Sequence, residues 1–180
     1  MRRFSWLYLL AAAACTAAPA YAQAPPPIHG LTGTIATEAT IKDEKKAANK
    51  IAVETKDGIE HVYDAAKGLK VHGGDQILAD LKPGTTVVIH YSPDNTVQEI
   101  DRVGGDDGLR TTEGMATKID RGKKEITIRY DNGKIEKLKL TDRAAADVGT
   151  NISPDTRIVV YYSTDARAKV THYFKAVETK

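Results

Sequence analysis

The sequence predicts an all-β protein that consists of two tandem small barrels, each with five strands and one short helix. Short runs rich in Val, Ile and Thr alternate with turn residues at spacings typical of sandwiches and barrels. The same pattern of strands and turns occurs twice along the chain. The only Cys lies in an N-terminal segment that we expect to be removed, so a disulfide scaffold is excluded.

The first 22 residues have the pattern of a removable signal peptide. Arg2 and Arg3 form a positive start, an apolar stretch follows, and Ala20 and Ala22 are the small residues that a signal peptidase reads. This stretch is shorter than the roughly 20 residues needed to cross a bilayer, and no later segment is a transmembrane candidate. We therefore expect cleavage after Ala22 and a periplasmic or secreted protein. A lipid anchor on Cys15 is the alternative, because three alanines precede it as in a loose lipobox.

The processed chain is electrically balanced. Removing 22 of the 180 residues leaves 158, with 24 basic and 24 acidic side chains, because only two Arg and no acid are lost. The loss of Cys15 excludes a Cys nucleophile and a thiolate metal site. Residues 23–30 are rich in Pro and are expected to form an extended spacer.

The rest of the chain repeats one unit. A single duplication indicates two domains, whereas a solenoid needs three or more stacked units. We place the first barrel at 31–103, a flexible Gly- and Asp-rich joint at 104–110 and the second barrel at 111–176. Two pairs of segments match at a spacing of 75 residues, namely 51–53 with 126–128 and 57–58 with 132–133. Further along, 59–62 matches 135–138 at a spacing of 76, and 87–92 matches 158–163 at a spacing of 71.

Each copy is expected to contain the elements of an OB fold in order. A short helix is expected between the third and fourth strands, at 75–81 and at 142–148, because an Asp able to cap a helix begins each segment. Three strands, a short helix and a final hairpin is the OB-fold order, and an SH3-like barrel is the alternative. The strands of the first copy are expected at 33–40, 50–55, 59–63, 86–91 and 96–103.

The first hairpin is expected to turn through a two-residue loop, Asp57-Gly58. This loop places Val53 opposite Val62, with both in the core. Glu54, His61 and Tyr63 would then face outward.

The second hairpin needs a longer loop. A two-residue Asn132-Gly133 loop would place Ile128 opposite Lys137, so that a charged side chain would share the core-facing side of the hairpin with an apolar one. A three-residue loop that ends at Gly133 avoids this and places Gly133 in the left-handed conformation. The inward residues of this hairpin are then Ile126, Ile128, Leu138 and Leu140.

Several short motifs mark the strands and turns of each copy. They are Gly33-Thr34-Ile35, Ile51-Ala52-Val53, Asp57-Gly58, and Leu81-Lys82-Pro83-Gly84 before Val87-Val88-Ile89. This pattern resembles the small OB-like β-barrel domains that bacteria export, most of which have no assigned function. The resemblance covers nearly all of residues 31–176. It implies a tandem duplication of such a domain and assigns no catalytic residue.

The five histidines do not form a readable metal motif. No two histidines have the short sequence spacing of a metal-ligand pair. None recurs in the other copy either, since His61 matches Lys137 and His90 matches Tyr161. One Met and no Trp remain after processing, so the soft ligands that select copper are absent. The sequence therefore predicts no metal and no cofactor, and added copper, zinc or calcium should leave the melting temperature unchanged. The histidines are His29, His61, His72, His90 and His172.

No catalytic constellation is readable either. Ser92, Ser153 and Ser163 remain after processing, and none lies in a Gly-x-Ser-x-Gly elbow. No phosphate-binding loop or dinucleotide fingerprint is present. We therefore expect no enzyme, although a perturbed carboxylate or a His pair in a cleft would revive that hypothesis.

A group of basic residues in the second copy is a candidate site for an anionic ligand. Residues 104–180 carry 15 basic and 12 acidic groups, against 9 and 12 in residues 23–103. OB folds bind ligands on the face of strands two and three and on the flanking loops. Nucleic acid is not expected as a ligand, because no aromatic platform accompanies the cations. The candidate residues are Arg121, Lys123, Lys124, Arg129, Lys137, Lys139 and Arg167.

These observations predict a non-catalytic, exported binding or interaction module of the cell envelope. Its partner is an unidentified envelope protein or an anionic polymer, and its oligomeric state is left open. Three alternatives remain: a structural spacer or lipoprotein component, a weak binder of anionic polymer through the second barrel, and an uncharacterised enzyme.

Overall fold

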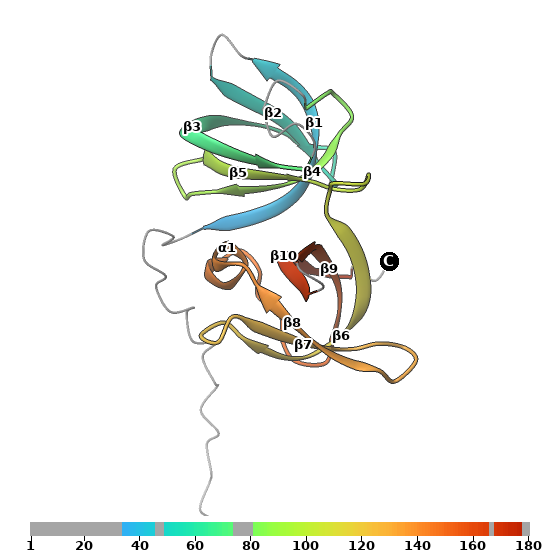
Figure 1. Cartoon of the computed structure of the whole chain (residues 1–180). Helices are drawn as coiled ribbons and strands as arrows, with labels where there is room; N and C mark the ends of the chain where they lie inside the picture. Colours follow the sequence, from blue (N-terminus) through green and yellow to red (C-terminus); the bar gives the residue numbers. More distant parts are fainter. Residues whose placement is uncertain (1–33, 46–48, 74–80, 166–167, 178–180) are drawn as a thin grey trace, which may run out of the picture.

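The computed structural model describes residues 34–45, 49–73, 81–165 and 168–177. These residues form two closed β-barrels, one above the other, with a short helix between them (Figure 1). The prediction of an all-β protein with two tandem five-stranded barrels is confirmed. Four predicted features lie outside the described residues, namely the signal peptide with Cys15, the spacer at 23–30, residues 75–80 of the first helix, and Arg167.

The first barrel consists of β1 (Ile35–Lys45), β2 (Lys50–Thr55), β3 (Glu60–His72), β4 (Thr86–Tyr91) and β5 (Thr96–Arg102). The strands pair in the order β1-β2-β3-β5-β4, and β1 closes the ring by pairing with β4. β3 runs parallel to β5, whereas the other pairs are antiparallel. This is the strand order of an OB fold, not of an SH3-like barrel.

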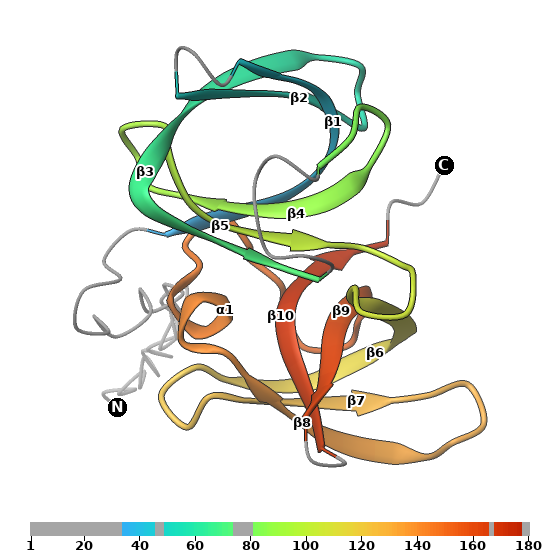
Figure 2. The same cartoon turned by 45° about the horizontal axis from the view of Figure 1, so that its top comes forward.

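The second barrel repeats this order with β6 (Arg110–Asp120), β7 (Glu125–Arg129), β8 (Ile135–Leu140), β9 (Thr156–Asp165) and β10 (Ala168–Ala176). Helix α1 (Asp142–Ala146) lies between β8 and β9, as predicted. Its N-cap is Thr141 rather than Asp142, because the Thr141 hydroxyl accepts a hydrogen bond from the Ala144 backbone N–H at 3.1 Å. Figure 2 shows the ring of the first barrel from above.

Each barrel encloses its own apolar core. Ile51 and Val53 are buried in the first, and Ile126, Ile128 and Leu138 in the second, as the strand patterns predicted. Alternation of apolar and polar residues explains this, since successive side chains of a strand point to opposite faces.

The predicted register of the first hairpin is wrong. The loop has three residues, because the Thr55 N–H donates to the Ile59 carbonyl at 3.0 Å, and Val53 therefore lies opposite His61. Val62 is consequently 48% exposed, whereas Tyr63 is buried at 5%. The Asp57 carboxylate stabilises this loop by accepting hydrogen bonds from the Thr55 hydroxyl and the Ile59 N–H.

The second hairpin has the predicted register. Ile126 lies opposite Leu138, and the loop ends at Gly133 with φ +79°. Both hairpins therefore use the same three-residue loop, and the spacing between the copies stays at 75 along the whole hairpin. The predicted shift to 76 does not occur, because His61 is equivalent to Glu136 rather than to Lys137.

The two barrels meet through the outward face of β4 and β5 and the outward face of β9 and β10, which we call the seam. Its apolar part is one cluster in which Ala36, Val88 and Leu109 pack against Tyr161 and Tyr173. Polar contacts flank this cluster. The Val148 N–H donates to the Thr34 carbonyl at 2.9 Å, and Lys175 forms an ion pair with Glu38.

The seam joins equivalent faces of the two copies. In the first barrel Val88 pairs with Asp101 and His90 with Glu99, and in the second Val159 pairs with Lys175 and Tyr161 with Tyr173. The same register and the same bulge position, at Gln98 and His172, recur in both strand pairs. The duplicated domains thus bury matching surfaces against each other.

The joint between the barrels is folded rather than an open linker. The Leu109 N–H donates to the Arg102 carbonyl at 2.7 Å, and the Gly104 N–H donates to the Leu109 carbonyl at 2.8 Å. A Cβ on Gly108 would lie 2.0 Å from the Gly104 carbonyl oxygen, so only glycine fits there. These contacts replace the flexible joint that composition alone predicted.

Candidate functional site

The strongest candidate site is a group of histidines and carboxylates in the seam. β5 contributes Glu99 and Asp101, which alternate with the core residue Ile100 and therefore point outward from the first barrel. The neighbouring strands add His90 from β4 and His72 from the end of β3, and β10 of the second barrel adds His172. We call these five residues the seam cluster.

Asp101 lies at the centre of the seam cluster and is fully buried. Its Oδ2 is 3.1 Å from Nε2 of His90, which is also fully buried, and 3.3 Å from Nδ1 of His172. The carboxylate therefore lies between one histidine of each barrel. Burial raises the pKa of the Asp101 carboxyl, but its contacts with His172 and His90 outweigh this and hold the pKa well below its ordinary value.

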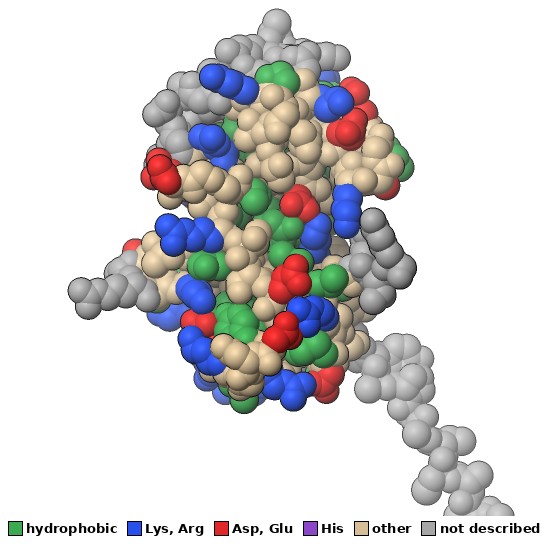
Figure 3. Space-filling model, turned by 90° about the vertical axis from the view of Figure 1, so that its right-hand side faces the viewer, with side chains coloured by type: hydrophobic (Ala, Val, Ile, Leu, Met, Phe, Trp, Pro, Cys, Tyr) green, Lys and Arg blue, Asp and Glu red, His purple; other side chains and the backbone are tan. Residues whose placement is uncertain are grey.

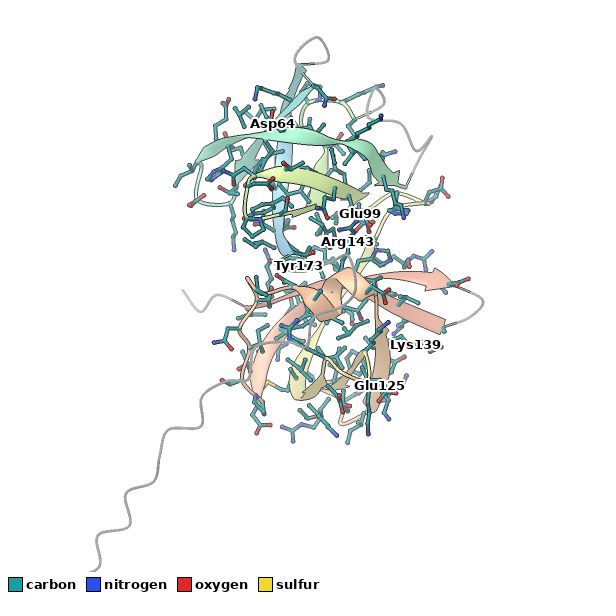
Figure 4. All side chains as sticks on the ribbon, turned by 90° about the vertical axis from the view of Figure 1, so that its left-hand side faces the viewer. Asp64, Glu99, Glu125, Lys139, Arg143 and Tyr173 are labelled. Atoms are coloured by element: carbon teal, nitrogen blue, oxygen red, sulfur yellow. The ribbon has the colours of Figure 1, made fainter. Side chains whose placement is uncertain are left out.

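Glu99 carries the second acidic group of the cluster. Its Oε2 accepts a hydrogen bond from Nε of Arg143 on α1 at 2.7 Å, and its Oε1 lies 3.7 Å from Nε2 of His72. Arg143 also donates to the side-chain oxygen of Gln98 at 2.7 Å. Figure 4 shows Glu99 and Arg143 side by side where the helix meets the first barrel. An open pocket next to them is lined by Lys70, Glu99, Thr141, Asp142 and Arg143.

Several buried polar atoms of the cluster have no hydrogen-bond partner among the described residues. They include Oδ1 of Asp101, Nδ1 of His90 and Nδ1 of His172. The His172 atom is close to Asp101 Oδ2 but poorly directed for a hydrogen bond, so we regard that contact as electrostatic. Unpaired buried polar atoms cost free energy, so each of these atoms requires a partner such as a water molecule, an ion or another ligand.

His172 also contacts a hydroxyl group. Its Nε2 lies 2.9 Å from Oγ of Ser163 on the neighbouring strand β9. Ser163, His172 and Asp101 are therefore arranged in the order of a Ser-His-Asp triad. Ser92, the equivalent serine of the first barrel, instead forms a short hydrogen bond to Asp94 in a turn.

The basic residues predicted as an anion-binding face do not form one continuous group of free cations. Arg121 is a structural residue, because its guanidinium donates to the carbonyls of Ala144, Ala145 and Thr150 and lies over the ring of Phe174. This removes Arg121 from the predicted face.

The remaining basic residues are partly neutralised. Lys124 forms an ion pair with Asp142 and Lys137 one with Glu125. Lys123, Arg129 and Lys139 are exposed, as is Lys137. Figure 4 places Lys139 and Glu125 on the second barrel away from the seam, and Figure 3 shows Lys and Arg interspersed with Asp and Glu on another side of the molecule.

Sequence spacing did not reveal the seam cluster. His72 lies next to β5 because β3 pairs with β5 inside the first barrel, whereas His172, which is 100 positions further along the chain, reaches the same strand only because the barrels dock. One signal pointed to the covered faces. The runs Val87-Val88-Ile89 and Ile158-Val159-Val160 are apolar at consecutive positions, which is typical of strands buried on both faces.

Comparison with models of known protein families and with curated proteins finds no match to this chain. Within the described residues, no helix has the length and hydropathy needed to cross a membrane.

Proposed function

We propose that this chain is an exported, non-catalytic binding module of the cell envelope whose ligand binds at the seam cluster. The observation that carries the proposal is the buried Asp101, which has a free Oδ1 and two histidines with free Nδ1 atoms around it. A ligand bound to Asp101 Oδ1 and His172 Nδ1 would satisfy these two atoms and would contact both barrels. The signal-like first 22 residues and the resemblance to exported β-barrel domains support the location.

Two measurements test this proposal. The intact mass of exported protein should correspond to a chain that starts at Gln23, whereas a diacylglyceryl group on Cys15 would establish a lipoprotein instead. Native mass spectrometry of the periplasmic protein, purified without chelators, should show an excess mass over the denatured chain.

A matched pair of variants locates that ligand. His72→Ala should remove the excess mass, because it removes a member of the seam cluster. The His72 side chain is 46% exposed, so its loss should leave the fold intact. His61→Ala, on the same strand but outside the seam cluster, should retain it. An excess mass that survives His72→Ala, or no excess mass at all, would contradict a ligand at the seam.

A second candidate function, acyl hydrolysis, is favoured by the Ser163-His172-Asp101 arrangement. In such a reaction Oγ of Ser163 would add to the carbonyl carbon of an ester, the π electrons would move to the carbonyl oxygen, and the serine proton would pass to Nε2 of His172. Collapse of this intermediate would break the bond to the leaving alkoxide, which would take that proton, and water would then release the acyl group. Binding is better supported, because His172 Nδ1 does not form the directed hydrogen bond to Asp101 that orients a catalytic histidine.

Covalent labelling separates the two candidates. A hydrolase should react with a fluorophosphonate probe, and Ser163→Ala should abolish that labelling while Ser92→Ala preserves it. We expect no labelling of the unmodified protein. Labelling that depends on Ser163 would overturn the non-catalytic proposal.

A further inference from the structure

We propose that the ligand of the seam cluster is one divalent first-row transition metal ion, such as Zn²⁺, bound by His72, Glu99, Asp101 and His172. This inference rests on the proposed binding function, because it names the chemical class of the ligand at the same site. It departs from the sequence-based prediction of no metal, which considered ligands close in the sequence and not ligands brought together by strand pairing in the first barrel and by docking of the second.

Three of the residues lie close enough together to be candidate metal ligands. The potential ligand atoms of His72, Glu99 and Asp101 all lie within 4.8 Å of one another, and His72 Nε2 is 3.7 Å from Glu99 Oε1. Ligand atoms of a tetrahedral zinc site lie about 3.4 Å apart when the bonds are about 2.0–2.1 Å long. Binding of an ion would therefore draw these ligand atoms closer together, and the His72 side chain is 46% exposed.

His172 lies outside this group of three but next to Asp101, and it would be the fourth ligand. Its Nδ1 is buried, lacks a hydrogen-bond partner and lies 3.3 Å from Oδ2 of Asp101. When Nε2 of His172 carries the proton and donates it to Oγ of Ser163, Nδ1 presents a lone pair. Ser163 would then orient the imidazole, as the hydrogen-bond partner of a metal-binding histidine does.

The oxygens not needed by the ion are already held by the protein. Arg143 occupies Oε2 of Glu99 and leaves Oε1 facing His72. His90 occupies Oδ2 of Asp101 and leaves Oδ1 without a partner among the described atoms. Such hydrogen bonds fix the orientation of ligating carboxylates.

The donor set defines the class of metal. Two imidazoles with two carboxylates suit zinc, nickel, copper or iron, whereas Ca²⁺ requires six to eight oxygen ligands. The exposed edge of His72 gives the ion access from solvent.

The inference is tested by metal titration of chelator-treated full-length processed protein. Zn²⁺ should bind at one ion per chain and raise the melting temperature, whereas Ca²⁺ should do neither. Co²⁺ should bind in its place and give the intense visible absorption of a four-coordinate site. His72→Ala should weaken Zn²⁺ binding by more than about 100-fold and Ser163→Ala by about 10-fold, since ligands contribute more than the groups that orient them.

His61→Ala is the matched control and should bind Zn²⁺ as the unmodified protein does. Absence of a one-to-one complex, or affinity that does not change in His72→Ala, would overturn the inference. The two proposals can be distinguished. An excess native mass that depends on His72 but is not a metal would support the binding site and reject the metal ion, whereas no excess mass that depends on His72 would reject the binding site itself.

Discussion

Arg143 of α1 donates its Nε–H to Oε2 of Glu99 at 2.7 Å and so connects the second barrel to β5 of the first. Both side chains are almost buried, at 14% and 11% exposed. Arg143→Ala would leave a buried carboxylate without its cation and should lower the free energy of unfolding by about 2–3 kcal/mol. Chemical denaturation followed by circular dichroism measures this change.

The control for Arg143→Ala is Lys42→Ala, which removes an ion pair to Glu54 on the solvent side of the first barrel. Exposed pairs contribute little to stability, so this variant should unfold as the unmodified protein does. Equal effects of the two substitutions would show that the Arg143 contact does not stabilise the seam.

Leu109 should contribute strongly to stability although it lies in the short joint between the barrels. Its side chain is 4% exposed within the apolar part of the seam. Leu109→Ala should lower the free energy of unfolding by about 2–4 kcal/mol, because it removes buried methyl groups and leaves a cavity. Ile135→Ala, at a position that is 64% exposed, should change it by less than about 0.5 kcal/mol. A joint that does not pack would give the same small value for both, measured by urea unfolding.

Gly133 requires a backbone conformation that other residues resist. Its φ is +79° and a Cβ there would meet no atom within 4 Å, so strain rather than a clash decides the effect. Gly133→Ala should lower the free energy of unfolding by about 1 kcal/mol. Gly122→Ala, at a turn glycine outside the positive-φ region, should leave the melting temperature unchanged or slightly higher. A calorimetric scan that finds equal shifts would show that the loop conformation is wrong.

The basic residues of the second barrel should bind polyanions only through overall charge. Lys123, Arg129 and Lys139 are exposed, but their neighbours are ion-paired or tied to the backbone. We therefore expect the full chain to elute from heparin at low salt, where screening is weakest. Lys123→Glu/Arg129→Glu/Lys139→Glu and a charge-matched triple variant elsewhere should elute alike. A selective loss of retention in the first variant would instead support an anionic ligand on this face.

The local patterns of the chain were enough to predict its two barrels but not every register. Ile126 and Ile128 alternate with polar residues, so their inward positions followed directly. The Asp57-Gly58 motif is compatible with a two-residue loop or with the end of a three-residue loop. Val62 and Tyr63 are both apolar, and only packing shows that the larger ring fills the core.

The seam cluster could not be predicted in the same way. Its members alternate with core residues, which marks their outward direction but not what covers them. His172 reaches Asp101 only through contacts between domains, and no local propensity encodes such contacts. A pair of strands with apolar residues on both faces was the available indication that a partner surface exists.

The matching faces that meet in the seam have a consequence for how this architecture assembles. Two separate copies of a single barrel could make such a contact only as a self-complementary dimer, whose population would fall on dilution. Here the folded joint at residues 104–109 keeps the second face next to the first at a high effective concentration. The duplication therefore turns a concentration-dependent association into part of the fold, which would preserve a two-barrel site even when the protein is scarce.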